Sequence, residues 1–526
     1  MNVRLRLRGW LQVRTPLHVG GIALDPAEAL PVAVDGRDRP YVPGTSLAGA
    51  LRAWMRGVDT RPKALEDLWG FVPDGESDEG QASRVVVHDA LITTSMALDA
   101  DGMPVDLIDP LALPSREGVG IDRFTGAAAP EIFHSRTVIP AGSYLRLELD
   151  VESTGDQIEC DRTRLRDLRG ALAAGQIALG ASTSGGLGVV RLVGETIYEQ
   201  DLTTPQGLLA LLRGETSGAD LDSTGGAGLP ARRDVLLVEI RWRPLAPVMV
   251  RATGEAPVIG TLPLSSKYED GSYVLNLPGR ALKGALRSHA EFIERTARGK
   301  CAPDRPSGEM PAQAYSVNFR AQLDQLPAIK ALFGTANRSP AGDGFAWGRG
   351  ALTAHECVTT TKIPADVWEI LADGPTESGE PSLPSAKRPS LPSEERKRLA
   401  EAGMDQADHA AIDRWTGGAA DERLYSVLEP HGVEWEPLRL SVDLTRLGDY
   451  RGICLALLLL VLRDLQGGRI ALGGMITRGF GDIDVESITV SGHHWPGGTP
   501  LDEALQSEHI ASLDRQWRHY LKEVKV

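Results

Sequence analysis

The sequence predicts an α+β protein built from two tandem copies of one domain, each with helices on one face of an antiparallel sheet. Three observations support this prediction: four motifs that recur in one order, the strand-like and helix-like segments around them, and one low-complexity stretch between the copies. The chain has 526 residues, enough for about three average domains or two large ones. Its 42% hydrophobic and 24% charged residues exclude a wholly disordered or collagen-like chain.

Four short motifs occur twice in the chain. The most distinctive begins with Pro-Gly and ends with Leu-Arg, as PGTSLAGALR in the first copy and PGRALKGALR in the second. The paired segments are 43–52 with 278–287, 68–70 with 332–334, 121–126 with 412–417, and 175–188 with 468–481. Because the four pairs keep one order, they indicate a duplicated domain.

The spacing of the motifs also predicts the domain boundaries. We expect a first domain at 1–213, a flexible linker at 214–233 and a second domain at 234–526. The linker is rich in Gly, Ser and Asp, a composition that cannot form a packed core. The second copy is longer, and we expect surface insertions without a packed core near 300–313 and 373–405.

Each element follows from a local pattern. Residues 1–8 alternate apolar and basic side chains, which predicts a strand and argues against a signal peptide. A helix is expected after each Pro-Gly pair, with Thr45 or Ser46 as the N-cap in the first copy. The segments 165–174 and 455–465 predict a second helix in each copy, followed by a Gly-rich loop and a strand. This mixed order is typical of the split βαβ fold.

Charge, cysteines and hydropathy exclude several classes of protein. The longest apolar run, 453–462, is about half the roughly 20 residues that cross a bilayer, so we expect a buried helix and no membrane span. Because the N-terminus does not have the pattern of a signal peptide, we also expect a cytoplasmic protein. The four cysteines stand far apart without a C-x-x-C pair, which predicts free thiols. The net charge of −15 argues against nonspecific coating of nucleic acid, but it allows a local basic groove.

The repeated motifs leave two chemical interpretations open. The N–H groups at the start of each Pro-Gly helix could bind a phosphate, or the motif could only begin a helix. The Gly-rich loops match neither the P-loop nor the dinucleotide-binding pattern, and a Gly-rich turn alone is weak evidence for phosphate binding. Each Gly-rich loop occurs together with a Pro-Gly helix, and this happens twice in the chain. The combination is therefore more specific than either motif alone.

That combination resembles the RAMP superfamily of CRISPR-associated proteins, and within it the repeated backbone subunit of type III effector complexes. The similarity is carried by 15–21 (TPLHVGG), 40–52, the I-D-R-x-T-G segments and the G-x-x-x-x-x-G-x-G loops, and it covers nearly the whole chain. It implies two modified RNA-recognition-motif or ferredoxin-like domains in a filament of subunits. It also implies CRISPR RNA, target RNA and other CRISPR-associated subunits as partners, with no membrane, and a protruding hairpin that displaces target bases.

By the same resemblance, the Pro-Gly helices and the Gly-rich loops would hold the guide backbone. The residues concerned are Gly44, Ser46, Arg52, Gly185, Gly186, Gly188, Gly279, Arg280, Lys283, Arg287, Arg478, Gly479 and Gly481. Amide donors and a few basic side chains suit a groove that follows a nucleic acid strand. Base pairing with the guide would then read the target sequence.

The chain departs from the family at the expected cleavage site. The family cuts target RNA with an aspartate in the loop after the first strand, and Ala29 and Thr261 stand at that position here. Asp25 is the candidate instead, where a carboxylate could hold Mg²⁺ or Mn²⁺ or assist attack by the RNA 2′-hydroxyl. It could equally form only a turn. Glu28 and Glu255 are the alternates.

Three functions therefore remain open: a backbone subunit that cleaves target RNA from its first domain, a catalytically silent backbone subunit, and a self-contained two-domain enzyme unrelated to CRISPR. Asp122 and Asp413 are expected to cap turns, with the following arginine directed to phosphate or to a neighbouring subunit. His18, at the exit of the first strand, is either a catalytic imidazole or a packed side chain.

Overall fold

The computed structural model describes residues 3–23, 28–59, 63–73, 80–213, 229–268, 270–302, 311, 314, 317–319, 321–322, 325–335, 348–373, 391–492 and 494–523. It divides into two compact units. Unit 1 consists of Met1–Arg116, Ser135–Thr183 and Leu187–Arg233, and unit 2 of Glu117–His134, Ser184–Gly186 and Asp234–Val526. Most of the expected linker, 214–228, lies outside the described residues, and the domain boundaries expected from the sequence stay a prediction.

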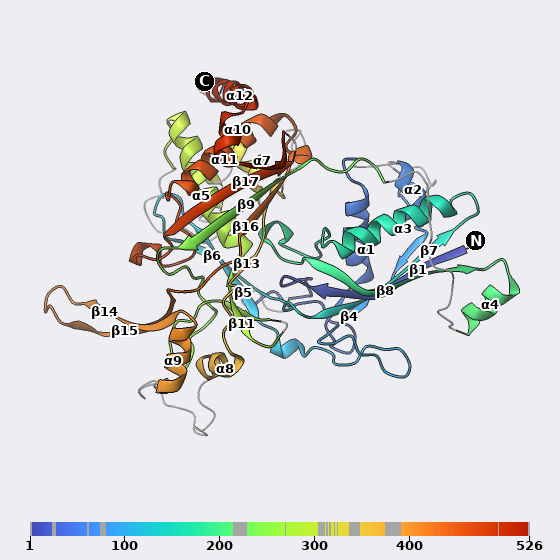
Figure 1. Cartoon of the computed structure of the whole chain (residues 1–526), viewed down its shortest axis with the longest axis horizontal. Coiled ribbons are helices and arrows are strands. Elements are labelled where there is room, and N and C mark those ends of the chain that lie inside the picture. Colours follow the sequence, from blue (N-terminus) through green and yellow to red (C-terminus); the bar gives the residue numbers. More distant parts are fainter. Residues whose placement is uncertain are drawn as a thin grey trace. The chain divides into compact units, whose positions relative to one another are not determined.

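Unit 1 is built on a six-stranded antiparallel sheet of order β2-β4-β7-β1-β8, in which β3 pairs with β7 (Figure 1). Its strands are β1 (Val3–Val13), β2 (Tyr41–Val42), β3 (Val85–Val87), β4 (Ala90–Thr93), β7 (Tyr144–Ser153) and β8 (Val190–Asp201). Its helices are α1 (Gly44–Met55), α2 (Lys63–Trp69), α3 (Ile158–Ala173) and α4 (Pro205–Leu212). Short 3₁₀ helices cover Pro110–Ala112 (η1) and Thr183–Gly185 (η2).

Strand β1 confirms the alternation expected at the N-terminus. Leu5, Leu7 and Leu11 are fully buried against the helices. The basic side chains between them face acidic partners on β7: Arg4 opposite Glu152, Arg6 opposite Asp150 and Arg8 opposite Glu148. Opposite charges directly across an antiparallel pair favour this register.

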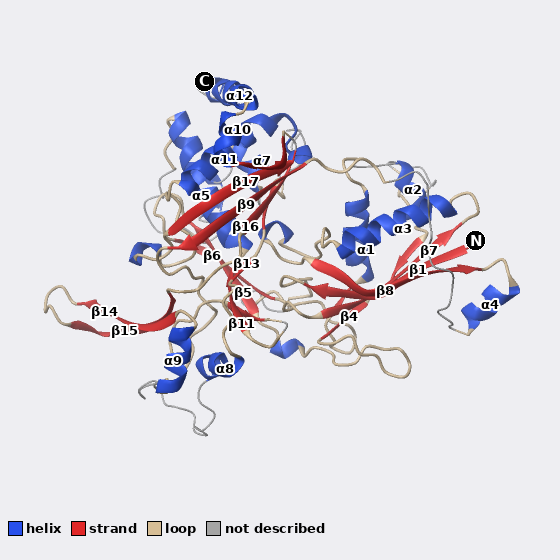
Figure 2. Cartoon of the chain, viewed as in Figure 1, coloured by secondary structure: helices blue, strands red, loops and turns tan. Residues whose placement is uncertain are grey.

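Unit 2 repeats this plan with a five-stranded sheet of order β12-β16-β9-β17-β18 (Figure 2). Its strands are β9 (Val235–Pro244), β12 (Leu352–Ala354), β16 (Leu438–Asp443), β17 (Ile483–Gly492) and β18 (Trp495–Pro500). A smaller sheet joins β10 (Ser265–Lys267), β11 (Tyr273–Leu277) and β13 (Cys357–Val358).

The helices of unit 2 are α5 (Gly279–Arg298), α7 (Pro327–Phe333), α8 (Ala365–Asp373), α9 (Ser393–Glu401), α10 (Arg451–Gln466), α11 (Leu501–Gln506) and α12 (Glu508–Glu523), with 3₁₀ helices η3 (Leu444–Tyr450) and η4 (Ile476–Arg478). Two hairpins stand apart from the main sheets: β5 (Ser115–Ile121) with β6 (Ala128–Thr137), and β14 (Met404–Ile412) with β15 (Ala419–Pro430).

The two units share one topology. In each, the first strand (β1 or β9) lies between the third and fourth strands of the repeat, β7 and β8 or β16 and β17. The second strand, β4 or β12, pairs on the outer side of the third. One helix follows the first strand and another follows the third. This arrangement confirms the predicted α+β fold of two tandem ferredoxin-like domains.

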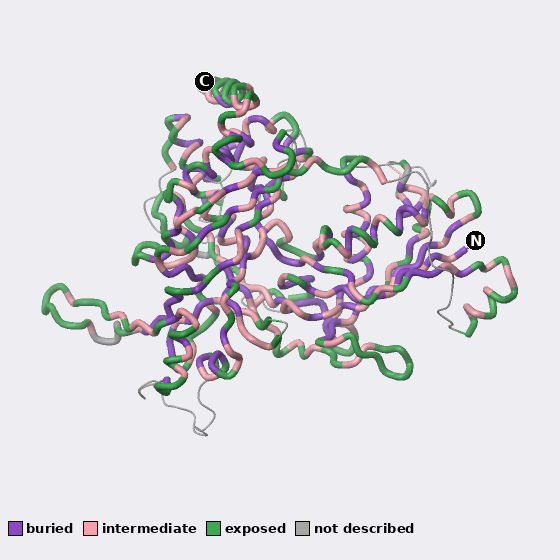
Figure 3. Tube along the Cα trace, in the orientation of Figure 1, coloured by how far each residue is buried: buried purple, intermediate pink, exposed green. Residues whose placement is uncertain are grey.

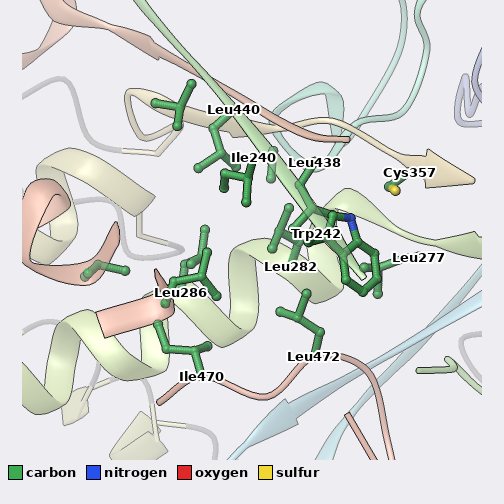
Figure 4. Close-up of a cluster of buried hydrophobic side chains, with 14 of the residues drawn as sticks. Ile240, Trp242, Leu277, Leu282, Leu286, Cys357, Leu438, Leu440, Ile470 and Leu472 are labelled. Carbon is green, nitrogen blue, oxygen red and sulfur yellow. The ribbon is translucent and has the colours of Figure 1, made fainter. Parts of the chain in front are cut away.

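The core of unit 2 lies between this sheet and the helices α5 and α10 (Figure 4). Figure 4 shows Ile240 and Trp242 of β9 with Leu438 and Leu440 of β16, facing side chains of α5 such as Leu286. The apolar run 453–462 lies within α10, which confirms the predicted buried helix. No helix in the described ranges is long and apolar enough to cross a membrane. All four cysteines are free, as expected.

One of the expected insertions is partly core. Leu391, Leu399 and Met404 are each at most 4% exposed and belong to the core of unit 2. The Pro- and Ser-rich composition of 373–405 was therefore misleading for 391–404, because α9 buries its few apolar side chains. Residues 374–390 and most of 300–313 lie outside the described residues.

Candidate RNA interface

The Pro-Gly helices begin in the same way in both copies. Pro43 and Pro278 are the N-caps, with nearly equal dihedral angles (φ −57°, ψ 138° and φ −59°, ψ 136°), and neither helix has a side-chain cap. The expectation that Thr45 or Ser46 caps α1 is thus wrong. The Gly44 N–H instead donates to Asp89 Oδ1 at 2.7 Å, so this donor has a partner within unit 1.

The glycine of each pair is required by a close approach of the helix to a neighbouring segment. A Cβ atom at Gly44 would collide with the carbonyl oxygen of Val87 at the end of β3. At Gly279 it would collide with the carbonyl oxygen of Ala354 at the end of β12. Gly44 and Gly279 are therefore explained by packing, and their contact with RNA stays a prediction.

The arginine that ends each motif connects two repeated motifs. Arg52 Nη2 donates to Gly70 O, and Arg287 Nη1 donates to Gly334 O, each at 3.0 Å. Gly70 and Gly334 are the glycines of the Leu-Trp-Gly and Leu-Phe-Gly repeats. Both arginines thus hold the helix to the following segment, and any contact with a phosphate would be additional to that role.

Two further predicted RNA-binding residues lie on the first turns of α5. The Lys283 ammonium donates to the carbonyl oxygen of Leu352 at 2.7 Å. Burial, helped by the positive charges of Arg287 and Arg349, lowers the pKa of Lys283 to about 7. Arg280 is half-buried. Lys283 is therefore a weak cation at neutral pH, which makes it a poorer phosphate ligand than the sequence suggests. Ser46, at the corresponding end of α1, is half-buried.

The two Gly-rich loops differ in their surroundings. Gly188 and Gly481 have positive φ angles and lie so close to a carbonyl oxygen of their own loop, of Leu179 or Leu472, that a Cβ atom would collide with it. Gly185 and Gly186 are buried in unit 2, where Gly185 lies beside Arg280. The corresponding Arg478 and Gly479 are exposed. The second loop is therefore the one that offers an accessible basic side chain.

Both I-D-R-x-T-G segments form the tips of hairpins, and the expected turns are confirmed. Asp413 Oδ1 accepts from the N–H groups of Trp415 (2.7 Å) and Thr416 (3.0 Å). Asp122 Oδ1 accepts in the same way from Phe124 and Thr125, both at 2.9 Å. The hairpin of β14 and β15 projects from the rest of unit 2, and its tip is exposed (Figures 1 and 3).

The aromatic residue of each tip differs in exposure, and so does the arginine before it. Trp415 is 96% exposed and Phe124 is 54% exposed. Arg123 donates from Nε to Glu291 Oε2 of α5 at 2.6 Å, whereas Arg414 is exposed. The hairpin of the second copy thus presents an unshielded indole and a guanidinium at one tip.

The base of the same hairpin carries a polar cluster that the sequence did not predict. His409 Nε2 and His431 Nε2 each contact one oxygen of the Glu429 carboxylate, at 2.9 and 2.8 Å. The His409 ring stacks on Tyr425 with centroids 5.2 Å apart, and Arg478 Nη1 donates to the Tyr425 hydroxyl at 2.7 Å. Only Arg478 was among the predicted residues.

The predicted catalytic residues belong to different parts of the chain, with Glu28 in unit 1 and Glu255 in unit 2. Asp25 lies outside the described residues, and Glu28 and Glu255 are exposed. His18 is 3% exposed, its Nδ1 lies 2.7 Å from Thr137 O, and burial lowers its pKa. Among the described residues no group of three His, Cys, Asp or Glu could hold a metal ion. The expected divalent ion stays a prediction.

Comparison with known families agrees with the repeat. A family model described as the RAMP superfamily matches residues 10–191 and 245–484, together well over half of the chain. Each matched region contains one copy of all four motifs. A search of curated proteins found no match.

Proposed function

The chain belongs to the RAMP superfamily of CRISPR-associated RNA-binding proteins, with two such domains in tandem, and on this premise we propose that it is a backbone subunit of a type III effector complex. In this role it binds CRISPR RNA and the guide–target duplex together with other CRISPR-associated subunits. The family match argues against a self-contained enzyme unrelated to CRISPR.

The observation that carries the proposal is the exposed pair of basic and aromatic groups on the second copy. Arg478, in the Gly-rich loop, is exposed beside the base of the β14–β15 hairpin, and Trp415 is exposed at its tip. A guanidinium that pairs with phosphate and an aromatic ring that stacks on bases are the usual means of holding a nucleic acid strand without reading its sequence.

RNA binding by these groups is tested with two variants of the full chain and single-stranded RNA. We expect Trp415→Ala to weaken binding by about 1–3 kcal/mol, or roughly five- to 150-fold, without loss of thermal stability. Arg478→Glu should weaken binding and reduce the slope of log affinity against log salt by about 1 or more. Arg518→Glu, an exposed arginine on α12, is the matched control. Equal affinities of all three variants and the parent would contradict the assignment.

We also propose that the first copy cuts target RNA with Asp25, assisted by Mg²⁺ or Mn²⁺. The support is the sequence: Asp25 is the aspartate nearest to the family position at Ala29, and the corresponding stretch of the second copy, 251–263, contains no aspartate. In the assembled complex with matched target RNA and Mg²⁺, Asp25→Ala should remove one cut and leave RNA binding unchanged. Cleavage that is lost in Glu28→Ala or Glu255→Ala instead would move the assignment. A parent complex that never cuts matched RNA would favour a silent backbone.

A further inference from the structure

The cluster at the base of the β14–β15 hairpin has the composition of a general acid–base site. Glu429 is 8% exposed, yet its carboxylate is shared by two imidazoles that reach the surface, with 33% and 50% of the side chains of His409 and His431 exposed. Because an ionised carboxylate can only accept hydrogen bonds, each imidazole presents its Nε2–H to Glu429. Nδ1 of each neutral ring is then the nitrogen able to take a proton.

A cation and an aromatic ring adjoin the two imidazoles. Tyr425 lies directly opposite His409 in the hairpin register and stacks on its ring. Arg478 donates to the Tyr425 hydroxyl, and its guanidinium carbon lies 5.0 Å from the centre of that ring. The guanidinium has further donors beyond the one used here, so it can also bind a phosphate.

The backbone fixes the cluster in place. Thr261 N donates to Ser426 O and Leu428 N donates to Thr261 O, both at 3.0 Å, so the loop after β9 is bonded to β15 between Tyr425 and Glu429. Val427, between these two side chains on the same face, is fully buried with Met249 and Phe480. A rigid support of this kind keeps proton-transfer groups in position.

The first copy shows that the hairpin does not need this cluster to fold. Aligned on the I-D-R-x-T-G motifs, the counterparts of His409, Tyr425, Glu429 and His431 are Gly118, His134, Val138 and Pro140. Arg478 corresponds to Gly185 by its place in the Gly-rich loop. The first copy forms the same two-stranded hairpin with none of the three residues of the His-Glu-His group. Packing alone therefore does not account for their presence in the second copy.

We propose that His409, His431, Glu429 and Arg478 form a metal-independent site that cleaves an RNA strand at the base of this hairpin. The inference rests on the proposed RNA-binding function. One imidazole takes the proton of a ribose 2′-hydroxyl while O2′ forms a bond to the adjacent phosphorus. The P–O5′ bond breaks, and the other imidazole, in its protonated form, gives its proton to O5′. The products are a 2′,3′-cyclic phosphate and a 5′-hydroxyl end.

The remaining residues stabilise this step. Glu429 is a positioning residue, because its carboxylate orients both rings and favours the imidazolium formed as the 2′-hydroxyl loses its proton. Arg478 balances the charge that builds up on the phosphate oxygens. Tyr425 accepts a hydrogen bond from Arg478 through its hydroxyl, and its ring stacks on that of His409.

The test uses the full chain and a 5′-labelled, unstructured RNA in excess EDTA. The parent should cut the RNA and leave 2′,3′-cyclic phosphate ends, and a 2′-deoxy substitution at the cut position should block that cut. His409→Ala and His431→Ala should each slow cleavage by about 100-fold or more. His431 is half-exposed, so its variant should fold normally. His88→Ala is the matched control, since His88 is also a surface imidazole near a carboxylate, 3.8 Å from Asp150.

Binding of the 2′-deoxy RNA separates catalysis from affinity. His431→Ala should bind it within about twofold of the parent, and Glu429→Gln should cut slowly while still binding. No cleavage in EDTA, cleavage indifferent to both histidine variants, or products with 3′-hydroxyl ends would overturn the inference while leaving the proposed function intact. Absence of RNA binding by the parent would overturn both. Loss of a Mg²⁺-dependent cut in Asp25→Ala concerns only the proposed function.

Discussion

The fold alters the charge state of Lys283. Its side chain is half-buried in the first turns of α5, and its ammonium donates to the carbonyl oxygen of Leu352. Burial is the main cause that lowers its pKa from 10.5 to about 7. Between about pH 7 and 10.5 the unfolded chain therefore binds more protons than the folded chain, so the stability of the fold rises with pH across that window. Below pH 7 the destabilisation caused by the buried ammonium is complete.

Replacing this lysine should therefore stabilise the protein in a pH-dependent manner. We expect Lys283→Met to raise the melting temperature at pH 6, although loss of the hydrogen bond to Leu352 offsets part of the gain. A net gain of about 1 kcal/mol would appear as a shift of about 2–4 °C. The gain should shrink toward pH 10. Lys522→Met, at an exposed position of α12, is the control, and a difference that does not change with pH would contradict the assigned cause.

At the same scale, the predicted RNA-binding arginines have intramolecular partners that the sequence did not reveal, and their contact with RNA stays a prediction. Arg52, Arg287 and Arg478 were identified from repeated motifs, and the structure supplies an intramolecular hydrogen bond for each. The cluster around Glu429 could not be found in this way. Its members lie together because the hairpin register places His409 opposite Tyr425. The composition of one strand does not determine how that strand pairs with the next.

At the scale of elements, the hydrophobic pattern predicted the strands and helices and misjudged their ends. Strand β1 and helix α10 follow directly from alternation and from a continuous apolar run. The start of α1 does not, because a polar residue after Pro-Gly suggested a side-chain cap, whereas Gly44 N–H is satisfied by Asp89 from another segment. A hydrogen-bond acceptor from another segment cannot be recognised from the residues next to Gly44.

The two glycines of α1 should respond oppositely to substitution. Gly44→Ala places a methyl group against the carbonyl oxygen of Val87, and we expect a loss of about 1–3 kcal/mol in the free energy of unfolding. Gly49→Ala, at an exposed helical position with nothing near its Cβ, should gain about 0.5–1 kcal/mol. The same contrast is expected for Gly279 and Gly284 of α5. Chemical denaturation measures it, and equal effects at Gly44 and Gly49 would refute the packing explanation.

At the scale of the whole molecule, the repeat predicted the shared topology of the two sheets. It did not predict that residues 117–134 and 184–186, which belong to the first copy in sequence, are part of unit 2. Their inclusion depends on particular contacts, such as Ala129 with Phe319 and Arg123 with Glu291. Phe319 follows one of the expected insertions, where the repeated pattern gives no information.

The equivalent arginines of the two hairpins should therefore contribute differently to stability. Arg123→Ala removes one of the two arginines that pair with the buried carboxylate of Glu291 and leaves Arg287 in place, so we expect a loss of about 1–3 kcal/mol. Arg414→Ala should change stability by less than about 0.5 kcal/mol, because Arg414 is exposed. Thermal unfolding of both variants beside the parent checks this. Equal losses would show that the ion pair of Arg123 does not hold the hairpin.

The difference between Gly118 and His409 has a consequence for periodicity. In an assembly of identical subunits, every substitution appears at every position along the array. Fusion of two copies removes that symmetry, because each half can change alone, and the second half here carries a His-Glu-His group that the first lacks. The group occurs once per chain and not once per domain, so an array of several copies of this chain would repeat its chemistry at every second domain.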